Sequence, residues 1–388
     1  MSLRLFQAAG LNVGGGMIIS RTPFRVSLFG GGTDYPDWIR EHGGAVLGMA
    51  INKYCYLTVR SLPPFFEHKH RIVYSKIEQV RETSEIVHPA VRAVFSELAI
   101  DDGLEVHHDA DLPARSGLGS SSSFTVGLLN TLHALRGRMM SKAELCNEAI
   151  RIEQEVIGES VGCQDQVWAA YGGLNRIEFP REGGFSVRPV VLGHGRRQEL
   201  VASLILVFSG LSRFASDVAE EKISNIARNE RQLFTMRRMV DQAMDLLLDE
   251  NEPVHRLGEM LNESWMLKRS LASCVSNSRI DDIYEAAIAA GASGGKLLGA
   301  GGGGFLAFVT RPERRAAVCE ALRGLIQVTF EIDNEGSRIM IYEPNGIGAV
   351  HYSNQPAAPR SSTNLQADAR WSSIAGWSDN PAGVHVGE

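Results

Sequence analysis

The sequence predicts an α+β protein with two domains. The chain has 388 residues, 44% of them hydrophobic and 22% charged, which is enough material for two hydrophobic cores. Strand-like and helix-like segments are mixed along it, and one glycine-serine turn opens directly onto an amphipathic stretch. We expect a leader or flexible extension over 1–16, domains over 17–200 and 201–350, and a flexible tail over 351–388.

Hydrophobic periodicity predicts the elements of the first domain. Phe124, Leu128, Leu132 and Leu135 are spaced by three or four residues and form one apolar stripe, which indicates a helix. β-Branched residues and alternation indicate strands. The expected elements in chain order are strands at 18–29 and 54–59, a helix after the serines 120–123, a helix from the capping-box pair Ser141 and Glu144 to Gly158, and a compact helix after Asp165.

The second domain reads as an α+β sandwich. Residues 204–208 form a short continuous apolar run bounded by Ser209 and Gly210, which is typical of a buried strand. The other expected elements are a long charged helix at 215–249, helices at 253–272, 280–290 and 312–325, and strands at 305–310, 326–331 and 338–343.

Composition narrows the possible partners. A formal net charge of −6 gives no general attraction for nucleic acid or anionic lipid, so neither is an expected partner. The five cysteines are scattered without a CxxC pair, which disfavours a disulfide framework and a zinc site and fits a reducing cytoplasm. No apolar run approaches the roughly eighteen residues of a membrane span, and no signal-peptide pattern begins the chain.

The turn DLPARSGLGSSSSF, residues 111–124, predicts a phosphate site. Backbone N–H groups at a helix start are unpaired and carry the positive end of the helix dipole, while glycines let a polyphosphate approach the backbone. A serine-glycine linker ending in a helix cap is the simpler alternative, and the Lys-Ser/Thr pair of a P-loop is missing. The expected nucleotide-binding residues are Pro113, Ser116, Gly117, Leu118, Gly119, Ser120, Ser121 and Ser122.

Two further glycine clusters accompany this turn. RTPFRVSLFGGGTDYP, residues 21–36, runs from a strand through three glycines to an acid, and GASGGKLLGAGGGGFLAF, residues 291–308, precedes a strand-like run. Either cluster alone is as readily a tight turn or a bulge. Three such turns, each at the edge of a regular element, indicate one ligand site built from distant segments.

Together the three segments resemble the three motifs of the GHMP small-molecule kinases, a family that includes galactokinase, homoserine kinase and mevalonate kinase. PxxxGLGSS at 113–121 matches the family's phosphate loop, and the match extends over about 17–345 in the right order. The resemblance implies a ribosomal S5 domain 2-like N-terminal domain, a ferredoxin-like C-terminal sandwich, and phosphorylation of an alcohol with ATP and Mg²⁺. The stretches FGGGTDYP, GCQDQVWAAYGG and GLSRFASD most resemble members that act on D-glycero-D-manno-heptose 7-phosphate.

The resemblance also implies roles for single residues. Asp165 matches the catalytic aspartate that accepts or orients the acceptor's hydroxyl proton, and Arg25 matches its basic partner. Glu153 matches the Mg²⁺-binding glutamate, and Ser121, beside Ser120, completes the metal site. The expected substrate-binding residues are Gly31, Gly32, Thr33, Asp34, Gly162, Arg213, Lys296, Gly301, Gly302 and Gly303, with Arg213 and Lys296 as candidates for the substrate's own phosphate.

Each assignment has a simpler alternative. Asp165 could be a helix cap, Glu153 a solvated acid, and Lys296 a solvent-exposed lysine. Galactokinase carries Glu-His where this chain has Gly31-Gly32, so a carboxylate that holds galactose is missing and a larger or differently oriented sugar is favoured.

The resemblance therefore implies a kinase for the anomeric hydroxyl of D-glycero-D-manno-heptose 7-phosphate, on the way to a GDP-activated heptose of surface glycans. An L-fucose kinase, or a sensor with this fold that binds a ligand without turnover, are the alternatives. The anomer, the nucleotide preference, the residues at the distal phosphate and a possible homodimer stay open.

Overall fold

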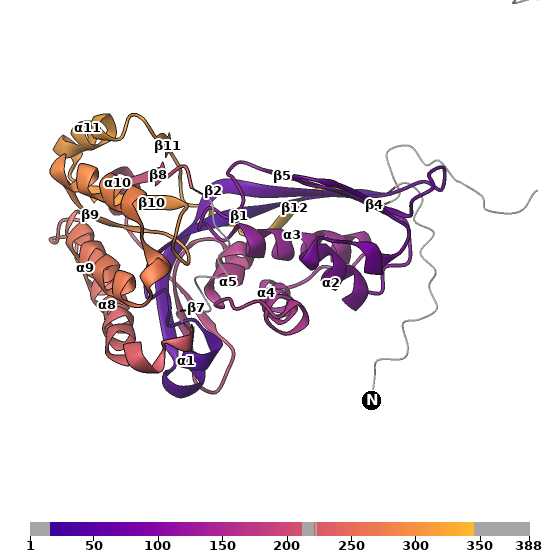
Figure 1. Cartoon of the computed structure of the whole chain (residues 1–388), viewed down its shortest axis with the longest axis horizontal. Coiled ribbons are helices and arrows are strands. Elements are labelled where there is room, and N and C mark those ends of the chain that lie inside the picture. The colour runs from indigo at the N-terminus through magenta and orange to yellow at the C-terminus, as the bar shows by residue number, and fades with distance from the viewer. Residues whose placement is uncertain (1–15, 212–220, 222, 345–388) are drawn as a thin grey trace, which may run out of the picture. The chain divides into compact units, whose positions relative to one another are not determined.

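The computed structural model describes residues 16–211, 221 and 223–344, all of which belong to one compact unit. Two β-sheets with helices against them make up this unit, so the predicted α+β class is confirmed (Figure 1). No helix among these residues is long and apolar enough to cross a membrane.

The larger sheet has eight strands, ordered β12-β1-β2-β5-β3-β4, and β6 and β7 extend it from β2. Its neighbours are antiparallel except for β3 and β5, which are parallel. The strands are β1 (Met17–Phe29), β2 (Gly44–Ser61), β3 (His70–Val73), β4 (Ile77–Val80), β5 (Leu104–Ala110), β6 (Leu174–Phe179), β7 (Ser186–Pro189) and β12 (Arg338–Glu343).

Helices cover one side of this sheet, and α2, α3, α4 and α5 lie there together (Figure 1). The predicted stripe of α3 is buried at Phe124, Leu128, Leu132 and Leu135, because α3 packs on β1 and β2. The helical segments are α1 (Pro36–His42), the 3₁₀ turn η1 (Thr83–Glu85), α2 (Pro89–Glu97), α3 (Ser120–Leu135), α4 (Lys142–Arg151), the π-helical η2 (Ile152–Ile157) and α5 (Gln164–Tyr171).

The smaller sheet is antiparallel, with the order β11-β8-β10-β9. Its strands are β8 (Leu204–Phe208), β9 (Ala292–Leu297), β10 (Phe305–Thr310) and β11 (Ile326–Val328). The helical segments of this half are α6 (His194–Ser203), η3 (Ala227–Asn229), α8 (Glu230–Leu248), α9 (Arg256–Ser270), η4 (Ser273–Val275), α10 (Ser278–Ala289) and α11 (Pro312–Ala321). Helix α9 packs on β9 and α8 packs beside α9.

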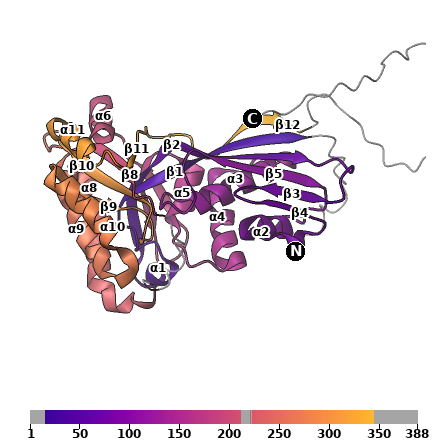
Figure 2. The ribbon, with the colours of Figure 1, turned by 45° about the horizontal axis from the view of Figure 1, so that its top comes forward.

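Some predicted bounds differ from the structure. Helix α8 begins only at Glu230, after the 3₁₀ turn η3, and residues 215–220 and 222 of the expected helix lie outside the described residues. The strand at 338–343 was expected in the second half, but as β12 it pairs with β1 in the larger sheet (Figure 2). The domain boundaries themselves stay a prediction.

Candidate active site

Helix α3 begins at Ser120 directly after the glycine turn, and Gly119 is its N-cap with φ 77°. In the part of the chain that the structure describes, no side chain caps this helix start, so its first N–H groups stay open to a ligand. The exposed side chain of Ser121 stands in this first turn. Sixteen residues of helix put the positive end of their dipole here, which suits an anion.

The two glycines of the turn meet different neighbours. A Cβ on Gly117 would lie 2.7 Å from the carbonyl oxygen of Leu298. A Cβ on Gly119 would lie 3.3 Å from Arg25 Cγ and 3.4 Å from Asp165 Oδ2. Both residues have positive φ, which side-chain-bearing residues adopt at a cost. The turn is therefore pressed between the 298–299 segment and the Asp165 carboxylate.

Arg25 and Asp165 form a two-pronged ion pair. Arg25 Nε donates to Asp165 Oδ1 and Nη2 to Oδ2, both at 2.7 Å. The third arm of the guanidinium, Nη1, donates to the carbonyl oxygen of Gly117 at 2.5 Å, and the backbone N–H of Arg25 donates to Leu118 O at 3.1 Å. Arg25 is only 5% exposed, whereas 25% of the Asp165 side chain is exposed. One arginine thus holds the carboxylate against the glycine-serine turn of residues 113–121, called the phosphate turn below, and leaves part of the carboxylate accessible.

Asp34 lies in the turn between β1 and α1 and is buried. Its Oδ1 accepts the N–H of Gly32 at 2.9 Å, and its Oδ2 accepts Gln164 Nε2 at 2.8 Å. Burial raises the pKa of Asp34, the bond from Gly32 opposes this rise, and the charge of Asp165 adds to it. A Cβ on Gly162 would lie 1.9 Å from Asp34 Oδ2, so glycine is required there. The predicted residues Asp34 and Gly162 are brought together beside Asp165.

Glu153 is fully buried in the π-helical segment after α4. Its Oε2 accepts Ser122 Oγ at 2.9 Å and Gln166 Nε2 at 2.5 Å, while Oε1 has no hydrogen-bond partner among residues 16–211, 221 and 223–344. Burial raises the pKa of Glu153 to about 7.

This donor set fits Mg²⁺, which takes oxygen ligands from one or two carboxylates and from substrate phosphates. Oε1 of Glu153 makes no direct hydrogen bond among the described residues, although the Thr125 hydroxyl interacts with this carboxylate and lowers its pKa, and the exposed hydroxyl of Ser121 is a second oxygen at the helix start. Within the described ranges, no group of three or more histidine, cysteine or acidic side chains could hold a metal by itself. A cation here would therefore depend on phosphate oxygens as well.

Two other predicted substrate-binding residues, Lys296 and Thr33, bond main-chain oxygens, and a third lies outside the described residues. Lys296 is buried in β9 and its Nζ donates to Leu28 O at 2.8 Å, so it ties the smaller sheet to β1. Thr33 is fully buried and its hydroxyl bonds the carbonyl oxygens of Gly30 and Ala45. Arg213 lies outside the described residues.

The glycine segment after β9 contacts protein backbone. Gly302 N donates to Val275 O at 2.9 Å, and a Cβ on Gly303 would lie 3.0 Å from Leu211 O. Neighbouring Gly301 shares this turn with positive φ. The N–H of Phe305 donates to Ser116 O at 2.9 Å, which joins the segment to the phosphate turn.

The remaining turn residues differ in exposure. Leu118 and Ser116 are buried, Pro113 is exposed, and Ser120 Oγ accepts the N–H of Arg115 at 3.1 Å. The glycines Gly31 and Gly32 are half-buried next to Asp34.

Sequence reasoning missed three polar residues around this site. Gln164 binds Asp34, Gln166 binds Glu153, and Ser27 Oγ donates to Gln164 Oε1 at 2.6 Å. The signal was the pair of amides on either side of Asp165 in GCQDQ, since amides are the side chains that bond both carboxylates and hydroxyls.

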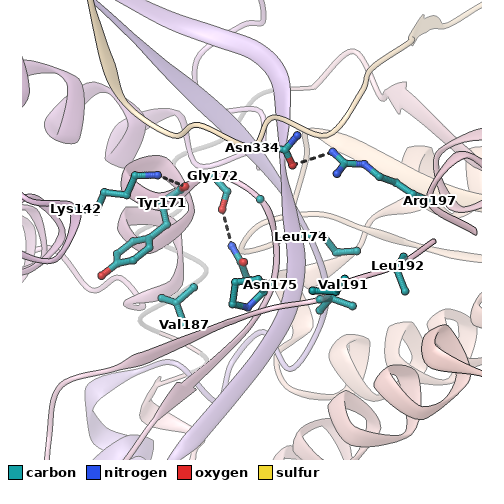
Figure 3. Close-up of a pocket in the computed structure, with 13 residues that line it drawn as sticks. Lys142, Tyr171, Gly172, Leu174, Asn175, Val187, Val191, Leu192, Arg197 and Asn334 are labelled. Carbon is teal, nitrogen blue, oxygen red and sulfur yellow. Dashed lines mark hydrogen bonds between the residues drawn. The ribbon is translucent and has the colours of Figure 1, made fainter. Parts of the chain in front are cut away.

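A cavity of about 440 Å³ lies at the opposite end of α5 from Asp165 (Figure 3). Its cationic side chains hold backbone and loop oxygens: Lys142 Nζ donates to Tyr171 O at 2.8 Å, and Arg197 Nη2 to Asn334 Oδ1 at 2.9 Å. These contacts anchor the end of α5 and the 331–337 loop, away from the phosphate turn.

Known proteins share these segments. Residues 85–173 match the family described as GHMP kinases N terminal domain, and residues 243–325 match GHMP kinases C terminal. The chain is 29% identical over 338 residues to D-glycero-alpha-D-manno-heptose 7-phosphate kinase of Campylobacter jejuni, covering 82% of this chain and 97% of that protein. It is 30% identical over 248 residues to mevalonate kinase of Thermococcus gammatolerans, covering 61% of this chain and 69% of that protein.

A solved structure shares the fold. The crystal structure of a D-glycero-D-manno-heptose 1-phosphate kinase from Bacteriodes thetaiotaomicron aligns with a TM-score of 0.68 at 23% identity, covering 84% of this chain and 99% of that one. Together with the matches to an N-terminal and a C-terminal GHMP kinase domain, this likeness confirms the predicted α+β GHMP kinase fold.

Proposed function

Because this chain belongs to the GHMP kinase family, we propose that it transfers the γ-phosphoryl group of ATP to the anomeric hydroxyl of D-glycero-D-manno-heptose 7-phosphate. The reaction class, phosphoryl transfer to an alcohol, follows from the family. The sugar is supported by the similarity to the Campylobacter jejuni protein over nearly its whole length. The product would be the 1,7-bisphosphate, a precursor of a nucleotide-activated heptose.

The main structural support for the proposed mechanism is the ion pair between Arg25 and Asp165. In phosphoryl transfer the protein mainly aligns the acceptor and balances charge. The open N–H groups at the start of α3 would bind the polyphosphate, and the exposed part of Asp165 would take the proton of the acceptor hydroxyl or orient it. Arg25 bonds this carboxylate and the carbonyl oxygen of Gly117 at once, so it links the proposed base directly to the glycine-serine turn.

Glu153 and Ser121 would hold Mg²⁺ in this scheme. The cation would neutralise charge on the transferring phosphates. Ser122 and Gln166 both bond Glu153 Oε2, which leaves Oε1 for the metal.

The acceptor side is built by the glycine turn. Asp34 is a hydrogen-bond acceptor for sugar hydroxyls, and Gly31, Gly32 and Gly162 bring no side chains beside it. This absence of bulk supports a larger acceptor than galactose.

A coupled ADP-release assay tests the proposal. Purified protein with ATP and Mg²⁺ is offered D-glycero-D-manno-heptose 7-phosphate, L-fucose, D-galactose and mevalonate at equal concentrations. We expect the highest kcat/KM for the heptose phosphate and a product phosphate that phosphorus NMR assigns to the anomeric carbon. A clear preference for another acceptor would refute the substrate. Nucleotide binding without ADP release from any of them would identify a sensor instead.

A further inference from the structure

A buried chain of three hydrogen-bonded side chains runs from strand β1 to the acceptor side of the site. Ser27 Oγ donates to Gln164 Oε1 at 2.6 Å, and Gln164 Nε2 donates to Asp34 Oδ2 at 2.8 Å. Ser27, Gln164 and Asp34 are 5%, 9% and 2% exposed. In such surroundings a side-chain amide that faces the wrong way leaves two polar groups unpaired, so its orientation matters.

The Asp34 carboxylate decides which end of the Gln164 amide faces it, because a carboxylate only accepts hydrogen bonds. The amide nitrogen therefore bonds Asp34, and the Ser27 hydroxyl, which can donate or accept, donates to the amide oxygen and holds that end of the side chain. A rotated amide would set its oxygen against a carboxylate oxygen, which is repulsive. Gly31 lies next to this arrangement, and a Cβ there would make ordinary van der Waals contacts, 3.6 Å from Gln164 Nε2 and 3.7 Å from Ser27 Oγ.

Three consecutive residues at the start of α5 bond three different side chains of the site. Gln164 bonds Asp34, Asp165 pairs with Arg25, and Gln166 bonds Glu153 at 2.5 Å. The same helical turn therefore joins the acceptor-side carboxylate, the phosphate-turn arginine and the buried glutamate. A shift of Asp34 relative to Asp165 would require Gln164 to release its bond.

We propose that Gln164 is a positioning residue that fixes the Asp34 carboxylate for the acceptor sugar, with Ser27 holding the other end of its amide. The inference rests on the proposed function, in which Asp34 binds acceptor hydroxyls. Asp34 Oδ2 accepts both the Gln164 amide and, at 3.4 Å, the backbone N–H of Gln164, whereas Oδ1 accepts the N–H of Gly32 and keeps a further lone pair for a sugar hydroxyl. Gln164 holds this lone pair in one direction without contacting the transferred phosphoryl group.

Steady-state kinetics of two variants and a control test this role. Gln164→Met keeps the length of the side chain but removes the amide, and Ser27→Ala leaves Gln164 and Asp34 intact but removes the hydrogen bond that holds the amide oxygen. Ser20→Ala is the control, because Ser20 is also buried on β1 and hydrogen-bonded, to Gly127 O at 3.2 Å, but has no contact with Asp34.

We expect Gln164→Met to raise the KM for the sugar by about ten-fold or more, as for loss of one hydrogen bond to a charged group, with the KM for ATP unchanged. Ser27→Ala should raise the sugar KM in the same direction by a smaller factor. Ser20→Ala should leave both KM values unchanged. Calorimetric titration of the sugar into each protein checks the same order without turnover.

The outcomes distinguish the role of Gln164 from the proposed function. An unchanged sugar KM and sugar affinity in both folded variants, or equal changes in the KM for sugar and ATP, would overturn the role of Gln164. If Gln164→Met fails to fold, Ser27→Ala decides by itself. Failure of the wild-type protein to phosphorylate any sugar would refute the proposed function, whatever KM values the variants show.

Discussion

Replacing Asp165 by Asn tests the proposed mechanism most directly. The change removes one charge and keeps the shape of the side chain. Arg25 now meets one amide oxygen and one amide nitrogen in place of two carboxylate oxygens, so one of its two 2.7 Å bonds to residue 165 is lost. Its third arm still donates to Gly117 O.

The structure sets the expected size of the effect on stability. Complete removal of one partner from a buried ion pair costs about 3–5 kcal/mol. Here a quarter of the Asp165 side chain is exposed and Asn keeps one acceptor, so we expect a loss of about 1–2 kcal/mol in the free energy of unfolding. Catalysis should suffer far more, because loss of a general base typically lowers turnover about 10²- to 10⁴-fold.

The assay combines turnover, nucleotide affinity and urea unfolding of the same samples. Nucleotide affinity should stay close to that of the wild type, because the N–H groups at the start of α3 are unchanged. Asp37→Asn is the matched control, since Asp37 also pairs with an arginine, Arg40, but on the surface. Wild-type turnover in Asp165→Asn would refute the role of Asp165, and a turnover loss that scales with unfolding would reduce it to a structural one.

Three further predictions concern other parts of the chain. Gly119→Ala should lower turnover and nucleotide affinity, because a Cβ would press on Arg25 and Asp165. Gly137→Ala is its control: it carries the same positive-φ strain of about 1–2 kcal/mol, but its Cβ would have no atom within 4 Å, so it should reduce only stability. Glu153→Gln should raise the Mg²⁺ concentration for half-maximal rate about ten-fold or more, measured by metal titration. Burial lowers the pKa of His70 from 6.5 to about 4, so the contribution of neutral His70 to stability is complete above pH 6.5 and is lost as the pH falls toward 4. The free energy of unfolding should fall by up to about 1.4 kcal/mol per pH unit over this range. His70→Gln should flatten this slope in urea unfolding, and an unchanged slope would contradict the assignment.

Local signals in the sequence predicted much of the fold. The capping box of Ser141 and Glu144 is present at the start of α4, with Glu144 N donating to Ser141 Oγ at 3.2 Å and Ser141 N to Glu144 Oε2 at 2.9 Å. Strand β1 begins and ends within one residue of its prediction. Such elements depend on neighbours in the sequence, and their chemistry is legible there.

Non-local pairing explains the errors. Only 54–59 of β2 was predicted, because residues 44–51 are all buried and include Gly48, whose missing side chain leaves space beside Val26 O and Trp168. Continuous burial removes the alternation that indicates a strand. Likewise, nothing within 338–343 indicates that its partner is β1, more than three hundred positions earlier.

Glycine patterns show why the site was only partly predictable. A glycine indicates that another group approaches the backbone closely, but a bound phosphate and a neighbouring strand both require the absence of a Cβ. At Gly304 the neighbour is Ser116 O, 2.2 Å from the position of a Cβ, and at Gly299 it is the Cα of Gly117 at 2.5 Å. The third glycine segment, residues 291–308, therefore packs directly against the backbone of the phosphate turn. Its contribution to phosphoryl transfer would be the shape of that turn, so we expect substitutions there to change ATP affinity before they change the choice of sugar.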